Sequence, residues 1–417
     1  MHSMSSNVDH ADRAREVLGH SRWWLILAAA AMMAVVGPYQ YVWSVIRQPV
    51  AAQIGINEAA LSTVFTLFVI FQAGSQFPVG SWRDEHGPRA ITYLAAVLAG
   101  GGYLGVAYAT SVWQVYLFYS LGAVGVGIVY TVAVNTAIKW FPDRRGLTSG
   151  VGTMAFAGGS AALVPYLRWQ FGPGAPPGTY VSVLRNLGIG IFLVILVGAY
   201  FLRDPPSGWL DTDDGESSGI RRVQFTWREM LRTWQFWVMY AMFVCVSGAG
   251  LMLTEKIVAY NDQLGLLPVV GTLAATVLPL AGGVGRLVLG GVSDRVDREN
   301  AMAAAFALCG LGLYAVVYFG VRGMAALFIV AVVVATFFWS PQYTLFPSVV
   351  GDYYGDENSS ANYALLYSGK MWGGVFGGTI TGFLVTDLGW DATFLLGGTL
   401  ALLSGFAALA LRPPSKD

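Results

Sequence analysis

The sequence predicts an all-α membrane protein with twelve transmembrane helices in two six-helix halves. Charged residues make up only 12% of the 417 residues and hydrophobic residues 55%, whereas a soluble domain carries about 25% charged residues. The apolar residues occur in runs of about 20, the length that an α-helix needs to cross a bilayer. One long polar stretch, residues 203–233, divides these runs into two groups of equal number.

Each predicted span begins and ends where an apolar run meets polar or charged residues. In the first half the spans are 23–46, 58–79, 90–109, 112–138, 147–167 and 184–202. In the second half they are 235–257, 267–291, 300–320, 324–348, 361–385 and 391–411. The predicted regions are a cytoplasmic N-terminal segment (1–22), an N-terminal six-helix half (23–202), a cytoplasmic linker (203–233), a C-terminal six-helix half (234–411) and a cytoplasmic tail (412–417).

Basic residues orient the chain, because loops on the cytoplasmic side of a membrane are enriched in Lys and Arg. With the N-terminus inside, most of the 24 basic residues fall in cytoplasmic segments. The outer segments then hold only Arg47, Arg168, Arg185, Lys256 and Arg322. We therefore expect a multi-pass protein of the plasma (cytoplasmic) membrane, embedded in the lipid bilayer, with both termini in the cytoplasm.

Composition also excludes several classes of function. Basic and acidic residues both number 24, so no nucleic-acid partner is indicated. Cys245 and Cys309 both fall in apolar spans and predict neither a disulfide nor a metal site, and no cofactor is expected. The Gly-rich segments lie inside apolar spans, so they are not nucleotide loops, and no enzyme is indicated. A channel needs rings of filter groups, which two unlike halves do not supply, and a monomer is expected.

A short motif occurs once in each half, at the cytoplasmic end of the second predicted helix. Its residues are Gly80, Asp84 and Arg89 in the first copy, and Gly290, Asp294, Arg295 and Arg298 in the second. The glycine permits close helix approach, the aspartate can bind the N-terminus of a neighbouring helix, and the arginines are expected to remain among the headgroups. One copy alone is equally typical of a turn in a positively charged loop. Two copies predict a gate that locks and releases as the halves rock.

Two further basic residues, Arg286 and Lys370, fall inside predicted spans. A guanidinium does not lose its proton, so its burial in a membrane costs several kcal/mol unless it is compensated. Arg286 is expected roughly 12 Å from the cytoplasmic surface, and Lys370 about 15 Å into its span. No acidic residue is placed to pair with either one. Two such cations repel each other until anionic charge arrives, which predicts a binding site for a small carboxylate.

Polar aromatic and amide side chains are expected to complete this site. Gln40 and Tyr41 follow Gly37 and Pro38 in the first span, where the proline is expected to loosen the helix. Tyrosine hydroxyls and glutamine amides can hydrogen-bond a carboxylate, and ring walls can exclude larger substrates.

Several stretches resemble a known family. They are YVWSV from Tyr41, FTL from Phe65, QAGSQ from Gln72, NTAIKWFPDRRGLTSG from Asn135, EMLRTWQFW from Glu229, YTLFPS from Tyr343 and NYALLYSGK from Asn362. With the repeated motif and the central linker, they resemble the major facilitator superfamily and, within it, the oxalate–formate antiporter family. Bacterial and animal monocarboxylate carriers are relatives of that family, and the resemblance covers nearly the whole chain after residue 23.

The resemblance implies roles for particular residues. Arg286 and Lys370 match the family's substrate-binding arginine and lysine, and three aromatic residues match positions that line the pocket. The substrate-binding residues that we predict are Arg286, Lys370, Tyr130, Trp339, Tyr343, Gln40, Tyr41 and Tyr367. Three positions depart from the family's oxalate exchanger, with Ser62 in place of glutamine, Phe156 in place of tyrosine and Tyr367 in place of tryptophan. These departures favour a monocarboxylate such as formate or lactate, whereas the basic pair favours exchange of the oxalate type.

We therefore predict a secondary active transporter that exchanges small carboxylates of the oxalate/formate type by alternating access. The alternative is a proton-coupled symporter of lactate-like monocarboxylates, in which protons are a second partner. A receptor or sensor built on a transporter fold is a more distant alternative. A symporter needs a group that takes up a proton, but Glu255 lies near the outer mouth and is expected to pair with Lys256 or to be solvated. The scarcity of buried acids favours exchange.

Overall fold

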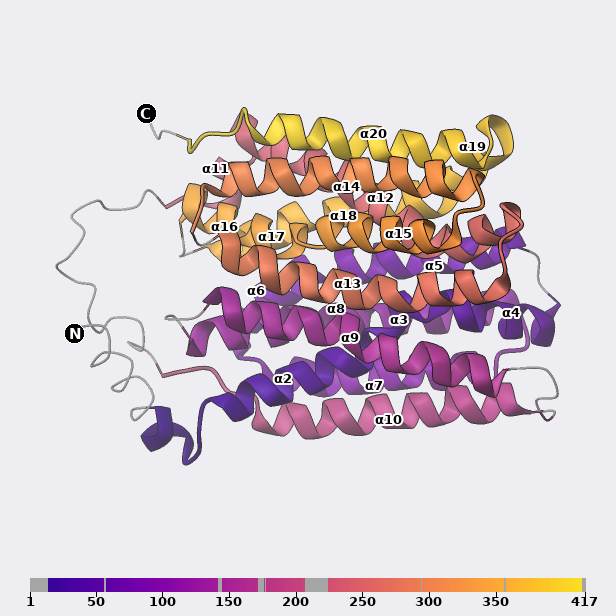
Figure 1. Ribbon diagram of the computed structural model, residues 1–417. Helices are drawn as coiled ribbons and strands as arrows, with labels where there is room; N and C mark the ends of the chain where they lie inside the picture. Colours follow the sequence, from indigo (N-terminus) through magenta and orange to yellow (C-terminus); the bar gives the residue numbers. More distant parts are fainter. Residues whose placement is uncertain are drawn as a thin grey trace.

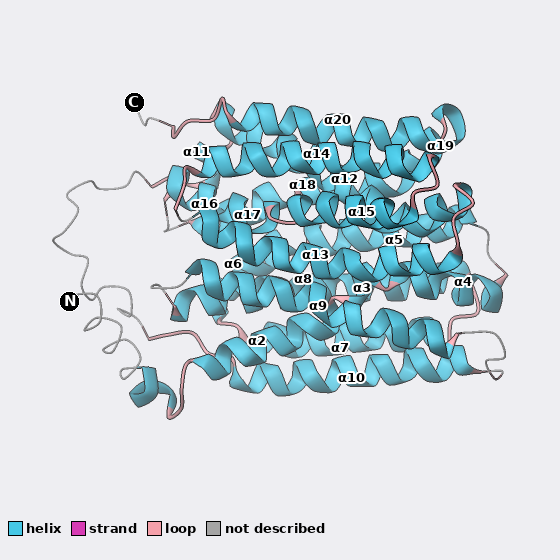
Figure 2. Ribbon diagram, viewed as in Figure 1, coloured by secondary structure: helices cyan, strands magenta, loops and turns pink. Residues whose placement is uncertain are grey.

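The computed structural model describes residues 14–55, 58–141, 145–171, 176, 178–206, 224–293, 295–355 and 358–414. In this part of the chain there are helices and connecting loops but no strands (Figure 2). The helices run side by side, and α2 begins at the end of the bundle where α20 stops (Figure 1). We call this the termini end, and the opposite end, beside α4 and α19, the far end.

The N-terminal half contains six predicted spans, and two of them are interrupted. The first is divided into three helices and the second into two. Its helices are α2 (Trp23–Val36), α3 (Pro38–Tyr41), α4 (Trp43–Ile54), α5 (Glu58–Gly74), α6 (Gln76–His86), α7 (Arg89–Ala107), α8 (Val112–Trp140), α9 (Arg145–Gln170) and α10 (Thr179–Phe201).

The C-terminal half also contains six predicted spans, but here the interruptions are in the fourth and fifth spans. Its helices are α12 (Trp234–Gln263), α13 (Pro268–Ser293), α14 (Arg298–Val321), α15 (Ala325–Trp339), α16 (Gln342–Tyr354), α17 (Ser359–Tyr367), α18 (Gly369–Val375), the π-helix η2 (Phe376–Ile380), α19 (Thr381–Leu388) and α20 (Trp390–Ala408). A short helix that the sequence did not predict, α11 (Trp227–Met230), precedes them and is capped by Thr226. Residues 1–13, 207–223 and 415–417 of the predicted terminal segments and linker lie outside the described residues.

The predicted membrane fold is confirmed. Eleven helices or helix pairs of the described residues are long and apolar enough to cross a membrane. The remaining predicted span, 361–385, corresponds to the interrupted run α17–α19, in which no single helix is long enough. Pro38 is expected to loosen the first span, and the structure interrupts the span there: α2 ends at Val36 and α3 begins at Pro38.

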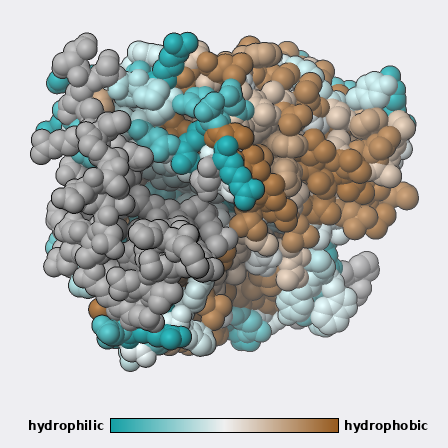
Figure 3. Space-filling view, turned by 60° about the vertical axis from the view of Figure 1, so that its left-hand side comes forward, coloured by the Kyte–Doolittle hydropathy of each residue, from teal (hydrophilic) through white to brown (hydrophobic). Residues whose placement is uncertain are grey.

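The outer wall of the bundle is apolar. Large exposed hydrophobic side chains lie on it, among them Leu193, Val197, Phe383 and Phe406. In Figure 3, brown residues cover this side wall, whereas teal residues gather toward the termini end. A hydrophobic surface of this extent is suited to lipid, because the helices satisfy most of their backbone groups internally.

Small residues hold the two halves close together. A methyl group added at Gly374 of α18 would lie 2.4 Å from Val69 Cγ1 of α5, and one at Gly283 of α13 would lie 3.3 Å from Met154 Cγ of α9. These contacts join α18 to α5 and α13 to α9 across the middle of the molecule. They bring the two helices that carry the intramembrane cations directly to the interface between the halves.

Candidate anion-binding site

Arg286 points from α13 into the interface between the halves and is 1% exposed. Its guanidinium donates three hydrogen bonds, from Nε to Ser340 Oγ at 2.5 Å, from Nη1 to the carbonyl oxygen of Thr153 at 2.9 Å and from Nη2 to the hydroxyl of Tyr41 at 3.1 Å. Thr153 and Tyr41 belong to the N-terminal half. The arginine of one half is therefore solvated largely by neutral groups of the other.

Lys370 reaches the same interface from α18 and is 2% exposed. Its Nζ donates to Gln40 Oε1 at 2.8 Å, to Gln72 Oε1 at 3.0 Å and to the hydroxyl of Tyr367 at 3.2 Å. Gln40 and Gln72 come from α3 and α5 of the N-terminal half. Both cations thus cross from the C-terminal half to neutral acceptors on the other side.

Gln72 is a residue that our site prediction missed. Besides accepting from Lys370, it donates from Nε2 to the Tyr367 hydroxyl at 3.4 Å. The available signal was an amide inside an apolar span, at the start of the QAGSQ stretch. Such a residue requires buried hydrogen-bond partners, but the sequence does not tell which ones.

One aromatic ring serves both cations. The Arg286 Cζ atom lies 4.8 Å from the centroid of the Tyr343 ring, and the Lys370 Nζ atom lies 5.4 Å from it. The electron-rich face of a tyrosine attracts a cation, by about 0.5–2 kcal/mol according to how far it is desolvated. Tyr343 therefore couples the two basic residues physically, although they lie on different helices.

The remaining predicted residues form the walls. Tyr367 lies with its ring centroid 5.7 Å from that of Tyr130 and 5.9 Å from that of Tyr343. Trp339 packs edge-on against Tyr343 at 5.8 Å, over Gly250, where a methyl group would lie 2.0 Å from the indole. All eight residues that we predicted for the site are at most 4% exposed. The structure brings them together in one enclosed cluster, and their role in binding remains a prediction.

Phe156, one of the three departures from the family pattern, also belongs to this wall. Its ring centroid lies 5.5 Å from that of Tyr130 and 6.0 Å from that of Tyr41. A phenylalanine contributes no hydroxyl to a bound anion at this point. The side chain of Ser62 lies outside the described residues.

Three buried polar groups in the cluster have no hydrogen-bond partner among the described residues. They are Nε2 of Gln40, Nε1 of Trp339 and the hydroxyl of Tyr343. Leaving a buried donor unsatisfied costs about 1–3 kcal/mol, so such atoms require an explanation. An anion held between the halves would supply the acceptor oxygens.

No carboxylate of the described residues lies within 4 Å of Arg286 or Lys370; the ion pairs found there all involve other groups. The sequence offered no partners for these cations. In the structure, however, neutral oxygens accept six hydrogen bonds from them. These bonds solvate the charges without neutralising them. Among the described residues no group of His, Cys, Asp and Glu could hold a metal ion.

The glycines of the repeated motif occupy equivalent places in the two halves. A methyl group at Gly80 would lie 3.9 Å from Thr131 of α8, and one at Gly290 would lie 3.9 Å from Thr344 of α16. The side chain of Asp84 and the whole of Asp294 lie outside the described residues. The structure thus places the two glycines alike, and the gating role of the motif remains a prediction.

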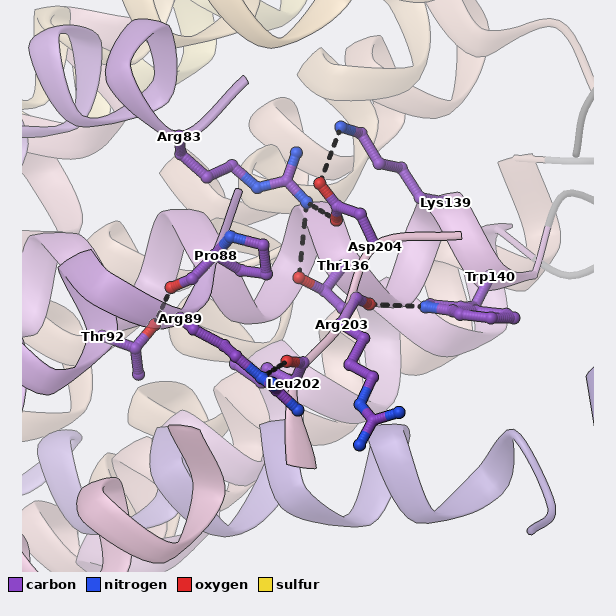
Figure 4. Close-up of polar contacts among 10 residues, drawn as sticks. All are labelled: Arg83, Pro88, Arg89, Thr92, Thr136, Lys139, Trp140, Leu202, Arg203 and Asp204. Carbon is purple, nitrogen blue, oxygen red and sulfur yellow. Dashed lines mark hydrogen bonds and ion pairs between the residues drawn. The ribbon is translucent and has the colours of Figure 1, made fainter. Parts of the chain in front are cut away.

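The arginines of the motif bind protein groups at the termini end. Arg89 donates to the carbonyl oxygen of Leu202 at 3.0 Å (Figure 4). It also donates to the carbonyl oxygen of Tyr200 at 2.9 Å, so it caps the C-terminal end of α10. Arg298 pairs with Asp352 of α16, within the C-terminal half. Arg295 is exposed.

Arg83 contradicts our expectation that the arginines of this loop remain among the headgroups. Its side chain is fully buried and donates to Asp204 at 2.6 Å and to Thr136 at 3.4 Å, while Lys139 approaches the same aspartate at 3.6 Å (Figure 4). Asp204 lies just after α10, where we placed the start of the linker. A buried guanidinium needs such a partner, and only the folded helices bring the two together.

A second group of buried charges lies toward the far end. Glu255 of α12 pairs with Lys256 at 2.7 Å, as expected, and also with Arg47 of α4 at 3.2 Å. The carboxylate is 1% exposed, so it is enclosed between the halves rather than solvated at a mouth. Glu255 is the only acidic residue classed as buried in the part of the chain whose burial is described.

Known proteins share this architecture. The family model described as "Major Facilitator Superfamily" matches residues 23–362 and 304–417. The oxalate:formate antiporter of Oxalobacter formigenes is 33% identical over 412 residues, which cover 94% of this chain and 90% of the antiporter. An uncharacterized MFS-type transporter of Escherichia coli is 26% identical, over 84% of this chain and 85% of its own.

A solved structure agrees in fold. The xylose transporter XylE from E. coli, in a partially occluded inward-open conformation, superimposes with a TM-score of 0.72 at 11% identity, over 94% of this chain and 99% of that one. The sequence matches and the helical arrangement agree with each other. The chain belongs to the major facilitator superfamily and, within it, to the family of the oxalate:formate antiporter.

Proposed function

We propose that this membrane transporter exchanges small carboxylate anions of the oxalate/formate type by alternating access. The observation that carries the proposal is the pair Arg286 and Lys370, enclosed between the halves with only neutral hydrogen-bond acceptors around them. A relative at 33% identity is described as an oxalate:formate antiporter, which supports the same substrate class.

The chemistry of the two cations suits a carboxylate. Arginine presents a planar fork that matches two carboxylate oxygens, and lysine presents a compact point charge. A dianion can engage both groups at once, and a monocarboxylate can engage one or bridge them. The donors of Gln40 and Trp339 that lack a partner among the described residues can add hydrogen bonds to the anion.

Charge balance explains why such a carrier exchanges rather than leaks. Enclosing two cations costs free energy, because each loses its water. The amide and hydroxyl oxygens around them offset part of this cost, and an anion offsets much more by direct Coulomb attraction in a low-dielectric site. The closed state is therefore populated mainly when an anion is bound. Return of the unloaded carrier is slow, and one anion leaves for each that enters.

A second candidate function is proton-coupled symport of a lactate-like monocarboxylate. The observation that favours it is Phe156, which places a ring without a hydroxyl against Tyr130 and Tyr41. A wall of this kind tolerates the methyl group of lactate better than a second carboxylate. In this case the proton travels with the substrate or on a group of the protein.

We also propose a plasma-membrane location with the termini end in the cytoplasm. Basic side chains gather at that end, among them Arg89, Lys139, Arg295 and Arg298. Cytoplasmic loops carry such an excess of basic residues. The two gate glycines, Gly80 and Gly290, would then lie on the cytoplasmic side of the site.

One panel of flux measurements tests the proposal. The purified protein in proteoliposomes is loaded with unlabelled oxalate, formate or lactate and presented with the labelled form of each. Counterflow without a pH gradient, at least for one carboxylate, is expected of an exchanger. Uptake that requires a pH gradient and no internal carboxylate would establish the symporter instead. Absence of flux for every carboxylate, in a preparation that is folded and monodisperse, would contradict both.

A further inference from the structure

The charge cluster of Arg47, Glu255 and Lys256 is not explained by the central site. Arg47 comes from the N-terminal half and the other two from the C-terminal half, and the carboxylate bridges both basic groups. Arg47 is 6% exposed and Lys256 is 7% exposed, so the cluster is enclosed. Breaking such an enclosed bridge requires that each charge find another partner.

The cluster lies between the central site and the far end. Arg47 follows Tyr41, which binds Arg286, by six residues, or about 9 Å along the helical backbone. Glu255 follows Gly250, which contacts Trp339, by five residues, or about 8 Å. Both helices run toward the far end at these points. The cluster is therefore placed where an anion entering from that end could meet it before it reaches the central site.

We propose that Arg47 and Lys256 form a second binding site for a carboxylate, which Glu255 occupies while the far end is closed. This inference rests on the proposed transport of carboxylates and adds a station on their route. A substrate carboxylate that arrives at the far end takes the place of the Glu255 carboxylate beside Arg47. The bridge between the halves then opens, and the anion proceeds to Arg286 and Lys370.

The geometry supports this assignment because a carboxylate already fits there. The Glu255 oxygens lie 3.2 Å from Arg47 Nη1 and 2.7 Å from Lys256 Nζ, so one carboxylate is within ion-pair distance of both cations. A free carboxylate has the same oxygens, charge and preferred geometry as the glutamate side chain. The internal group and the substrate therefore compete for the same two cations.

A weaker polar contact accompanies the bridge. The hydroxyl of Thr66 on α5 lies 3.1 Å from that of Thr379 in η2, again across the two halves. A single hydrogen bond between neutral groups contributes about a factor of ten or less to an equilibrium. The ion bridge is accordingly the contact on which competition by an anion acts.

The test compares the two sides of the membrane. Exchange of labelled oxalate is measured in membrane vesicles that present the far end to the medium and in vesicles of the opposite orientation. Arg47→Gln and Lys256→Gln are each expected to raise the far-end KM by about tenfold or more, through loss of a charged contact. The KM at the termini end is expected to stay within about twofold, since the central site is intact. Glu255→Gln removes the competing carboxylate and is expected to lower the far-end KM severalfold.

Controls separate this role from general effects of charge and folding. Arg322→Gln removes a positive charge at the same end, at an exposed site where α14 stops, and is expected to leave both KM values unchanged. The double variant Arg47→Gln/Glu255→Gln removes a charge pair and keeps the net charge, so it remains available if a single variant misfolds. Its far-end KM is expected to lie between those of the wild type and Arg47→Gln, because Lys256 is then free of its competing carboxylate.

Two results would overturn the proposal. In one, Glu255→Gln raises the far-end KM as Arg47→Gln does, which would make the cluster a brace without competition. In the other, the basic-residue variants change KM equally from both sides or not at all. Both results presuppose exchange by the wild-type protein, so they differ from a failure of the proposed function, in which the wild type itself shows no carboxylate flux.

Discussion

The Nζ atom of Lys370 lies 2.8 Å from Oε1 of Gln40, and this hydrogen bond joins the two halves of the transporter. The donor carries a full charge and the acceptor none. The halves are therefore held together at the centre by charges that are solvated but not neutralised. In the proposed function, an anion would bind at this point between the halves.

The first prediction concerns these two cations. Arg286→Gln and Lys370→Gln each remove one charge from the site and leave an amide that can still hydrogen-bond. Loss of a charge-assisted contact of about 2–3 kcal/mol predicts a decrease in kcat/KM for exchange of about 30- to 160-fold. Counterflow of labelled oxalate or formate in proteoliposomes measures it. Near-normal exchange by both variants would contradict the site assignment, with Arg322→Gln as the charge-matched control.

A second prediction follows from the position of Gln72. Its Oε1 lies 3.0 Å from Lys370 Nζ, so Gln72→Glu would place a carboxylate against the lysine. The internal ion pair would occupy the cation in place of substrate, and exchange is expected to be lost while the protein remains folded. Gln72→Leu is also neutral but removes the oxygen that accepts from Lys370. It is expected to raise KM by about tenfold.

The matched control for Gln72→Glu is Gln114→Glu. Gln114 is exposed on α8 and accepts hydrogen bonds from Thr110, an acceptor role that glutamate retains. Wild-type exchange by this control, beside loss of exchange in Gln72→Glu, would assign the effect to the site. Undiminished exchange by Gln72→Glu would show that Lys370 does not need to be free of a carboxylate.

A third prediction uses the close packing of the halves. Gly374→Ala would place a methyl group 2.4 Å from Val69 Cγ1, on the other half. Overpacking of this kind costs about 1–3 kcal/mol, and here the cost falls on the closed state. The maximal exchange rate is expected to fall by about tenfold, while equilibrium binding of oxalate changes less.

Gly382→Ala provides the comparison for this prediction, because nothing lies within 4 Å of a methyl group there. Both glycines belong to the same interrupted run, so helix propensity changes alike in the two variants. An equal decrease in rate for both would attribute the effect to the backbone of the run rather than to closure of the halves.

Hydropathy was sufficient to predict the twelve spans and the two halves, because lipid requires long apolar helices whatever their neighbours. It also placed Arg286 and Lys370 within the membrane. The free energy needed to bury a charge there marks both residues as candidates for a functional site. The partners were not predictable. Thr153 and Ser340 contact Arg286 from 133 and 54 residues away, and such contacts depend on how helices rotate and cross.

The interruptions of the spans show the same limit. A proline marks the break in the first span, but the break at Ser368, between Tyr367 and Gly369, has no such residue beside it. Arg83 and Arg47 also look like ordinary loop or boundary residues in the sequence, yet both are buried against acids. Hydrophobic periodicity reports burial of apolar faces and carries no information about a charge that is buried with its partner.

The last prediction concerns the termini end. Arg83→Gln would leave Asp204 without its closest cation and would replace a fully buried guanidinium by a shorter neutral group. Removing one member of a buried pair costs roughly 3 kcal/mol, somewhat reduced here because Asp204 is 28% exposed and Lys139 remains nearby. A lower thermal unfolding temperature in detergent is therefore expected. Arg203→Gln is the control, because the hydrogen bond from Trp140 Nε1 goes to the backbone oxygen of Arg203, which the substitution keeps (Figure 4). If the two variants unfold at the same temperature, the buried pair does not stabilise this end of the bundle.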